Sequence, residues 1–189
     1  MSEWMVTPLV LVPVLLLFLG LYVRGLAARL DRLHLRVEAS EAVLDARLER
    51  RATLTKEVAL DAGLDPVSAV LLLDAATAAL HVSRSGTARV TAESDLSSAL
   101  RAVFGDPETV SDLAADPDSR LMLTELAEVC VGVSLARRFA NDAVRAAVAL
   151  RRRGIVRALR LAGHAPWPQN RDLDDAPPEA LSQFALDAA

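Results

Sequence analysis

The sequence contains little that could cross-link the chain or build a β-sheet. Its 189 residues include one cysteine, Cys130, so no disulfide can form within the chain and nothing indicates an oxidising compartment. Aromatic residues make up only 4 %, whereas apolar residues make up 52 % and the mean hydropathy is +0.28. An aliphatic, alanine-rich chain favours closely packed helices over sheets, which prefer aromatic and β-branched residues. We therefore expect an all-α fold in which Cys130 is a small core residue.

The sequence also lacks recognisable catalytic, cofactor-binding and metal-binding motifs. His34, His81 and His164 lie far apart, and none has a second ligand at a metal-binding spacing. No phosphate-binding GxxxxGK[ST] loop is present, and no GxSxG pattern surrounds Ser83 or Ser85. We therefore predict no catalytic residue, no cofactor and no metal, and a protein that is not an enzyme. The net charge of −4 also argues against nucleic acid as a partner.

One long uncharged run is present near the N-terminus. Trp4–Val23 spans 20 residues without a charge, and a helix of that length covers about 30 Å, the thickness of a hydrocarbon core. Trp4 and Tyr22 lie at its two ends, where aromatic rings favour the membrane interface. A cleaved signal peptide is the alternative, although such a peptide normally begins with basic residues and only Ser2 and Glu3 follow the first methionine here. We favour an uncleaved anchor that contacts the lipid bilayer through Trp4–Val23.

The charges around this run predict its orientation. No lysine or arginine precedes it, whereas Arg24, Arg29, Arg32 and Arg36 follow it. By the positive-inside rule, a single-pass protein of the cell membrane would then have its N-terminus outside and its C-terminal domain in the cytoplasm.

The rest of the chain reads as a series of helices. Apolar residues recur at helical spacing over 26–61, and Gly63 is placed to end that helix. Asp65 is placed to cap the next helix, with Pro66 at its first position, and we expect this apolar helix over 66–82 to be buried. A loop over 83–90, a short helix over 91–104 and two restarts at Asp-Pro pairs follow.

A narrow heptad seam predicts a long final helix over about 117–162. The seam consists largely of small side chains and has the spacing of a coiled coil, which predicts antiparallel packing against the 26–61 helix. Its members are Met122, Leu126, Val129, Val133, Ala136, Ala140, Ala143, Ala147, Leu150 and Gly154. We therefore divide the chain into an anchor (1–25), a helical bundle of about four helices (26–163) and an acidic, proline-rich tail (164–189), which we expect to be disordered.

The end of this helix is strongly basic. Residues 137–160 hold eight arginines and one acid, Asp142. The acidic segments elsewhere in the chain could neutralise them, the anionic inner leaflet of a membrane could bind them, or they could bind nucleic acid. We rank the three in that order because aromatic stacking residues for nucleic acid are missing. The candidate contact residues for a lipid or a protein partner are Arg151, Arg152, Arg153, Arg157 and Arg160.

The order of these features resembles the LemA family. The stretch VEASEAVLDARLERRATL (37–54) is similar to the family's membrane-proximal helix, and the stretches at 94–104 and 107–129 resemble its middle segments. The last helix is similar in the spacing of an arginine, an aromatic residue, an asparagine and a valine. The matching positions are Asp45, Leu48, Arg50, Arg51, Leu54, Arg138, Phe139, Asn141 and Val144. The chain departs from the family pattern at Ala140 and over 53–57, so the resemblance is to a divergent member.

This resemblance implies a single N-terminal span and a cytoplasmic antiparallel helical bundle. With no catalytic motif in the sequence, we expect a membrane-anchored, non-catalytic scaffold or adaptor, whose partner is another protein or a second copy of the chain. The alternative is a domain that binds anionic lipid or organises the membrane through the basic end of the last helix.

Overall fold

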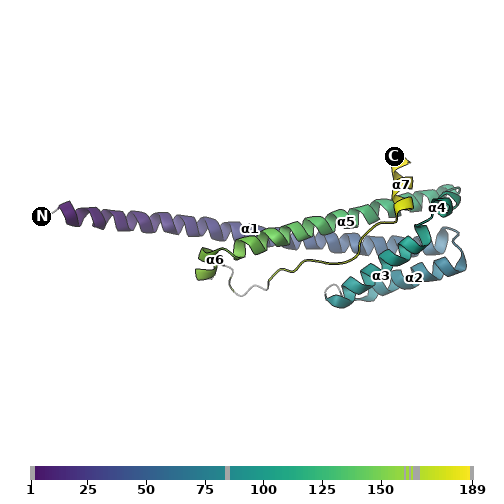
Figure 1. The fold of residues 1–189 in the computed structure, drawn as a ribbon, viewed down its shortest axis with the longest axis horizontal. Coiled ribbons are helices and arrows are strands. Elements are labelled where there is room, and N and C mark those ends of the chain that lie inside the picture. The colour runs from purple at the N-terminus through teal and green to yellow at the C-terminus, as the bar shows by residue number, and fades with distance from the viewer. Residues whose placement is uncertain (1–2, 84–85, 160, 162, 164–166, 188–189) are drawn as a thin grey trace. The chain divides into compact units, whose positions relative to one another are not determined.

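Figure 1 shows the chain as a computed structural model, which describes residues 3–83, 86–159, 161, 163 and 167–187. Every regular element formed by these residues is a helix, which confirms the predicted all-α class. In chain order the helices are α1 (Glu3–Asp61), α2 (Pro66–His81), α3 (Thr87–Phe104), α4 (Pro107–Leu113), α5 (Pro117–Arg151), α6 (Gly154–Ala158) and α7 (Glu179–Asp187).

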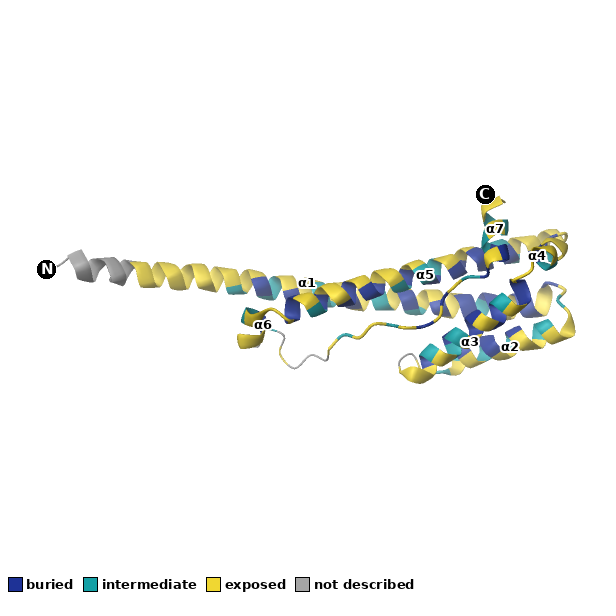
Figure 2. Cartoon of the chain, in the orientation of Figure 1, coloured by how far each residue is buried: buried dark blue, intermediate teal, exposed yellow. Residues whose placement is uncertain are grey.

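Helix α1 joins the apolar run to the amphipathic segment without a break (Figure 1). The side chains of residues 11–22 are all exposed, as the yellow stretch of Figure 2 shows, and they include Leu15 at 69 % and Phe18 at 66 %. Among the described helices, α1 alone has the length and composition to cross a membrane. A helical signal sequence would satisfy the same criterion.

The turn between α1 and α2 has the predicted chemistry. Gly63 has a φ of +70°, a left-handed conformation that glycine adopts without strain and that commonly ends a helix. The Oδ1 atom of Asp65 then accepts hydrogen bonds from the backbone N–H groups of Val67 and Ser68, at 2.9 and 3.1 Å. Pro66 follows at the first helical position, where its missing N–H costs nothing. The predicted start of α2 is therefore confirmed.

The contacts divide the chain into two compact units. The first unit comprises Met1–Glu38 and Asp142–Gln169, and the second comprises Ala39–Asn141 and Asn170–Ala189. Both α1 and α5 contribute to each unit. The boundaries of the units lie within α1, after Glu38, within α5, after Asn141, and in the chain that follows α6, after Gln169.

The first unit is built around apolar side chains of α1, α5 and α6. Leu26 and Leu30 of α1 form one cluster with Leu150 of α5 and Val156 of α6. Further along α1, Val37 packs in a second cluster whose other members come from α5: Ala143, Val144 and Ala147. Because higher numbers on α1 meet lower numbers on α5, the two helices run antiparallel within this unit, as predicted.

The second unit has the larger core. It combines side chains of α1, α2, α3, α4, α5 and α7, and Phe104 and Leu126 are completely buried in it. Cys130 belongs to this core at 2 % exposure, as predicted. Helix α2 is only half buried, which differs from its predicted burial. Leu72, Ala75, Ala76 and Ala79 face the core, whereas Val67, Val70 and Leu71 are exposed.

Helix α5 is shorter than the predicted 117–162 helix. It ends at Arg151, and a separate short helix, α6, begins at Gly154. Glycine weakens a helix interior by about 1 kcal/mol relative to alanine, which fits a break at this position. From Val129 to Leu150 the predicted seam residues are all buried, so this part of the seam is correct. Met122 is only half buried, and Gly154 is exposed.

Candidate functional site

Only some arginines of the predicted basic site lie on the surface of the first unit. Arg151 is only 5 % exposed, and its guanidinium carbon lies 4.7 Å from the centre of the Trp167 ring, a cation–π distance. Arg151 is therefore not a surface contact residue, which corrects the prediction for this position. Arg152, Arg153 and Arg157 are exposed, as the prediction requires, and Arg160 lies outside the described residues.

These exposed arginines lie beside the part of α1 that directly follows the apolar run. Val156 of α6 packs with Leu26 and Leu30, three and seven residues after Val23. Two apolar side chains that follow α6 in the sequence are also exposed: Leu159 at 49 % and Trp167 at 54 %. The end of the first unit that lies next to the apolar run thus presents cationic and apolar side chains together.

The LemA-like residues of α1 fall into three groups in the second unit. Leu48 and Leu54 are core residues, each 1 % exposed. Arg50 lies on the surface, where it forms an ion pair with Glu125 and a longer one with Glu57 at 3.9 Å. Such exposed pairs contribute little to stability, about 0–1 kcal/mol each. Asp45 and Arg51 instead belong to an internal polar cluster.

That cluster is centred on Glu93 of α3, whose side chain is completely buried. Its two carboxylate oxygens lie 2.8 Å from the Nη2 atom of Arg51 and 2.8 Å from the Nη2 atom of Arg89. Arg51 also donates to the hydroxyl oxygen of Ser97 at 2.9 Å, and Arg89 donates to the carbonyl oxygen of Ala79 at 2.9 Å. Two buried guanidiniums therefore share one buried carboxylate.

Burial and the neighbouring positive charges shift the pKa of Glu93 in opposite directions. Removal from water raises the pKa of Glu93, whereas the positive charges of Arg51 and Arg89 act to lower it. Asp45, whose negative charge also raises the pKa of Glu93, lies at the edge of the cluster. The ion pairs and hydrogen bonds of this cluster link α1, α2 and α3.

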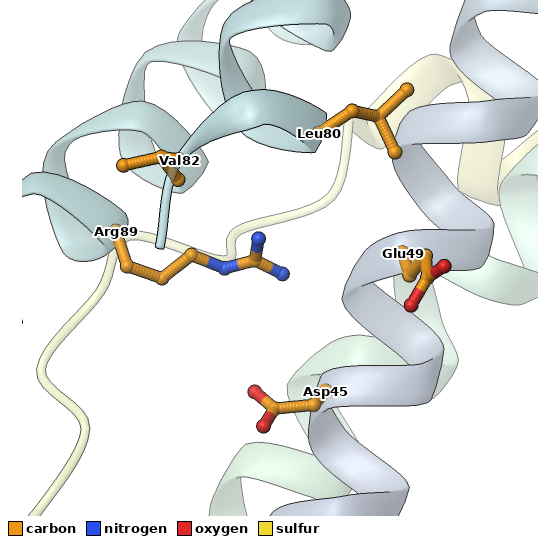
Figure 3. A pocket seen from close by; sticks show the side chains of 5 residues that line it. All are labelled: Asp45, Glu49, Leu80, Val82 and Arg89. Carbon is orange, nitrogen blue, oxygen red and sulfur yellow. The ribbon is translucent and has the colours of Figure 1, made fainter. Parts of the chain in front are cut away.

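A pocket of about 140 Å³ opens beside this cluster. Asp45 and Glu49 of α1, Leu80 of α2, and Val82 and Arg89 line it, and in Figure 3 Asp45 and Arg89 reach into it from opposite sides. The Oδ1 atom of Asp45 is buried and has no hydrogen-bond partner within the described part of the chain. Because liquid water occupies about 30 Å³ per molecule, the pocket has room for a few waters that would satisfy this oxygen.

The LemA-like residues of α5 point both inward and outward. In the second unit Asn141 is buried, and its side chain hydrogen-bonds the backbone N–H and C=O of Arg171 at 2.9 and 3.2 Å. In the first unit Val144 is a core residue. Arg138 and Phe139 are exposed, Phe139 at 55 %, so these two matching positions do not lie in the core.

The C-terminal segment docks on the second unit, in contrast to the predicted disordered tail. We call residues 170–178 the C-terminal strap. Its Asp174 pairs with Arg101 of α3 at 2.5 Å, and its Asp175 accepts two hydrogen bonds from Arg137 of α5 at 2.6 and 2.9 Å. Leu173 of the strap is buried. Residues 164–166 and 188–189 lie outside the described part of the chain.

Each of these two ion pairs shifts the pKa of one of its residues. The hydrogen bond from Arg101 holds the pKa of Asp174 below its usual value, and the hydrogen bond to Asp175 raises the pKa of Arg137. The strap continues into α7, where Leu181 is completely buried in the core of the second unit.

Among the charged residues of these contacts, sequence reasoning missed Arg89 and Glu93 of the buried cluster, and Arg101, Asp174 and Asp175 of the strap contacts. The i,i+4 spacing of Arg89 and Glu93 is a helical ion-pair signal, but it was lost because the loop was predicted to extend to residue 90. No local signal connects Asp174 or Asp175 to arginines far away in the sequence.

Within the described residues, no group of three or more histidine, cysteine, aspartate or glutamate side chains is arranged to hold a metal ion. No protein-family model, no curated protein and no solved structure matches this chain.

Proposed function

We propose that this chain is a single-pass protein of the cell membrane, a divergent relative of the LemA family. Its N-terminus lies outside, and its cytoplasmic helices form a bundle of about four helices. That bundle acts as a non-catalytic scaffold or adaptor that holds a protein partner at the membrane. The observation that carries the proposal is the exposed apolar stretch of α1 over residues 11–22. It is continuous with the part of α1 that packs in the cores of both units.

The exposed apolar stretch supports anchorage because none of the described parts of the chain covers its side chains. Leu15, Leu16 and Phe18 each expose more than 60 % of their surface. A contiguous apolar surface of this kind is unfavourable in water and favourable in a bilayer. The arginines that follow it support a cytoplasmic location for the remaining helices.

The half-buried helix α2 supports the scaffold role. Val67 and Val70 are 79 % and 66 % exposed on a helix whose other face is in the core. Apolar side chains of this size on a helix surface are typical of a protein-contact face. The charged cluster beside the pocket supports a structural role, because Arg51 and Arg89 are already engaged with Glu93.

Anchorage and orientation are tested on the full chain expressed with a C-terminal tag. The protein should resist extraction by alkaline carbonate, and the tag should be digested by protease in inverted vesicles but protected in intact cells. A chain without residues 1–25 should appear in the soluble fraction. Extraction of the full chain by carbonate, or loss of its N-terminal residues on maturation, would show that the segment is not an anchor.

The scaffold role is tested by in-cell cross-linking followed by detergent extraction and pull-down. We expect a defined partner that is lost with the double variant Val67→Glu and Val70→Glu. The matched control carries two glutamates at exposed α3 positions, Thr91→Glu and Ala102→Glu, and should retain the partner. Recovery of no partner with any of these proteins would count heavily against the scaffold.

A further inference from the structure

We propose that the membrane-proximal end of the first unit is a binding surface for anionic phospholipid headgroups. In this proposal Arg152, Arg153 and Arg157 contact the headgroups, and Trp167 lies at their boundary with the acyl chains. The inference rests on the proposed anchorage, and it adds a second, lipid-selective contact that the anchor itself does not provide.

The position of α6 along α1 places these arginines at the right depth. Val156 packs against Leu26 and Leu30, which lie about 5–10 Å beyond Val23 at 1.5 Å per residue. The headgroup layer on each side of a bilayer is about 5–8 Å thick. With Val23 at the edge of the hydrocarbon core, α6 therefore lies within or next to the headgroups.

The charge of this region is predominantly positive. The sequence has no acidic residue between Asp142 and Asp172, a stretch that includes the whole of α6. On α1, the exposed residues Arg24, Arg29 and Arg32 are accompanied over 24–36 by one acid, Asp31. Negatively charged headgroups attract such clusters within a Debye length, about 8 Å at physiological salt.

Arg151 and Trp167 give the surface a fixed aromatic side chain. The buried guanidinium of Arg151 lies 4.7 Å from the centre of the Trp167 ring, while 54 % of Trp167 remains exposed. Leu159 adds an apolar side chain that is 49 % exposed. A tryptophan ring beside arginines is the composition that proteins use at the boundary between headgroups and acyl chains.

A bilayer is the occupant that these observations favour over a free anion. A free phosphate ion would need only the guanidiniums and would leave the apolar surfaces of Leu159 and Trp167 in water. A bilayer holds phosphate and hydrocarbon at adjacent depths, so it satisfies the arginines and the exposed apolar side chains together. The anchor also keeps this surface next to a bilayer at all times.

The chain's tryptophan content allows a direct test. Its two tryptophans are Trp4 and Trp167, so a Trp4→Phe variant reports on Trp167 alone. The full-length variant is reconstituted in nanodiscs of phosphatidylcholine with brominated acyl chains, with or without phosphatidylglycerol. We expect phosphatidylglycerol to increase the bromine quenching of Trp167 about twofold or more, and about 1 M salt to reverse this increase.

Charge variants then test the named arginines. Arg152→Gln, Arg153→Gln and Arg157→Gln together should abolish the phosphatidylglycerol effect. The matched control, Arg47→Gln, Lys56→Gln and Arg138→Gln, removes three exposed cations of the second unit and should preserve it. Inorganic phosphate added at constant ionic strength should leave the quenching unchanged, because the occupant is a lipid surface.

The outcomes separate this inference from the anchorage. If the protein enters nanodiscs but Trp167 is quenched equally with and without phosphatidylglycerol, the lipid surface is refuted and the anchor stands. An equal loss in the test and control variants would also refute it, because the effect would then be one of net charge alone. If the protein does not enter nanodiscs, the proposed anchorage itself fails.

Discussion

Replacement of Asp175 by asparagine should open the C-terminal strap without unfolding the second unit. The Asp175 carboxylate accepts two hydrogen bonds from Arg137, and the two side chains are 9 % and 23 % exposed. Removing one partner costs about 0–1 kcal/mol for surface pairs and about 3–5 kcal/mol for fully buried pairs. With Arg137 partly open to solvent, we expect about 2 kcal/mol for this pair, a value between those limits.

This loss is measurable at individual backbone amides. The N–H of Arg171 donates to Asn141, and the N–H of Asp174 donates to the hydroxyl oxygen of Ser94, so both exchange with solvent only when the strap opens. A change of about 2 kcal/mol corresponds to roughly 30-fold faster exchange at these two amides. Hydrogen exchange followed by NMR on the full chain in detergent micelles gives both rates.

The control is Asp172→Asn, which removes an exposed carboxylate from the same strap. It should change the exchange rates by less than about twofold, since surface charges contribute little. Unchanged exchange in the Asp175→Asn variant, or equal acceleration in both variants, would refute the assignment of the strap's stability to the Arg137 pair.

Three further predictions concern other parts of the chain. Burial raises the pKa of Cys130 to about 11, so its thiol should react very slowly with a maleimide at pH 8 and at an ordinary rate after denaturation. Gly105→Ala should lower the free energy of unfolding by about 1–3 kcal/mol in chemical denaturation, because the added Cβ would lie 2.5 Å from the carbonyl oxygen of Arg101. The control Gly154→Ala places its Cβ in open space and should leave the free energy of unfolding unchanged or raise it. The pKa of Asp174 is lower in the folded protein than its unfolded value of about 3.9. The stabilisation of the docked strap by Asp174 is therefore complete above about pH 3.9, and it is lost as the pH falls through the lower folded pKa. Amide exchange corrected for its intrinsic pH dependence should therefore show the strap opening only in acid, and an opening near neutral pH would contradict the Arg101 pairing.

Local signals in the sequence predicted the elements well. Gly63, Asp65 and Pro66 located the boundary between α1 and α2, because a left-handed glycine, a capping carboxylate and a proline each act on their own neighbours. The small-residue seam of α5 predicted its buried face from Val129 to Leu150 for the same reason. Both inferences used only short sequence separations: neighbouring residues at the boundary, and steps of three or four residues along the seam.

The candidate sites depended on contacts that such signals do not contain. Arg51 and Glu93 lie 42 positions apart, and Arg101 and Asp174 lie 73 apart, so nothing near either member indicates its partner. The acids and prolines of the strap matched a disordered composition because their arginine partners are on distant helices. Arg151 looked like its two neighbours in the sequence, but its burial and its contact with Trp167 distinguish it.

The hydrogen bonds between Asn141 and Arg171 have a consequence for the modularity of the chain. They hold together the two points at which the polypeptide leaves and re-enters the second unit. Residues 142–169 are thus a topological insertion, and their ends are close enough to be joined by about three residues of extended linker. A shortened polypeptide of residues 39–141, such a linker and residues 170–187 would retain every contact described for that unit's core. It would separate the second unit from residues 1–38 and 142–169, which include the apolar run of α1.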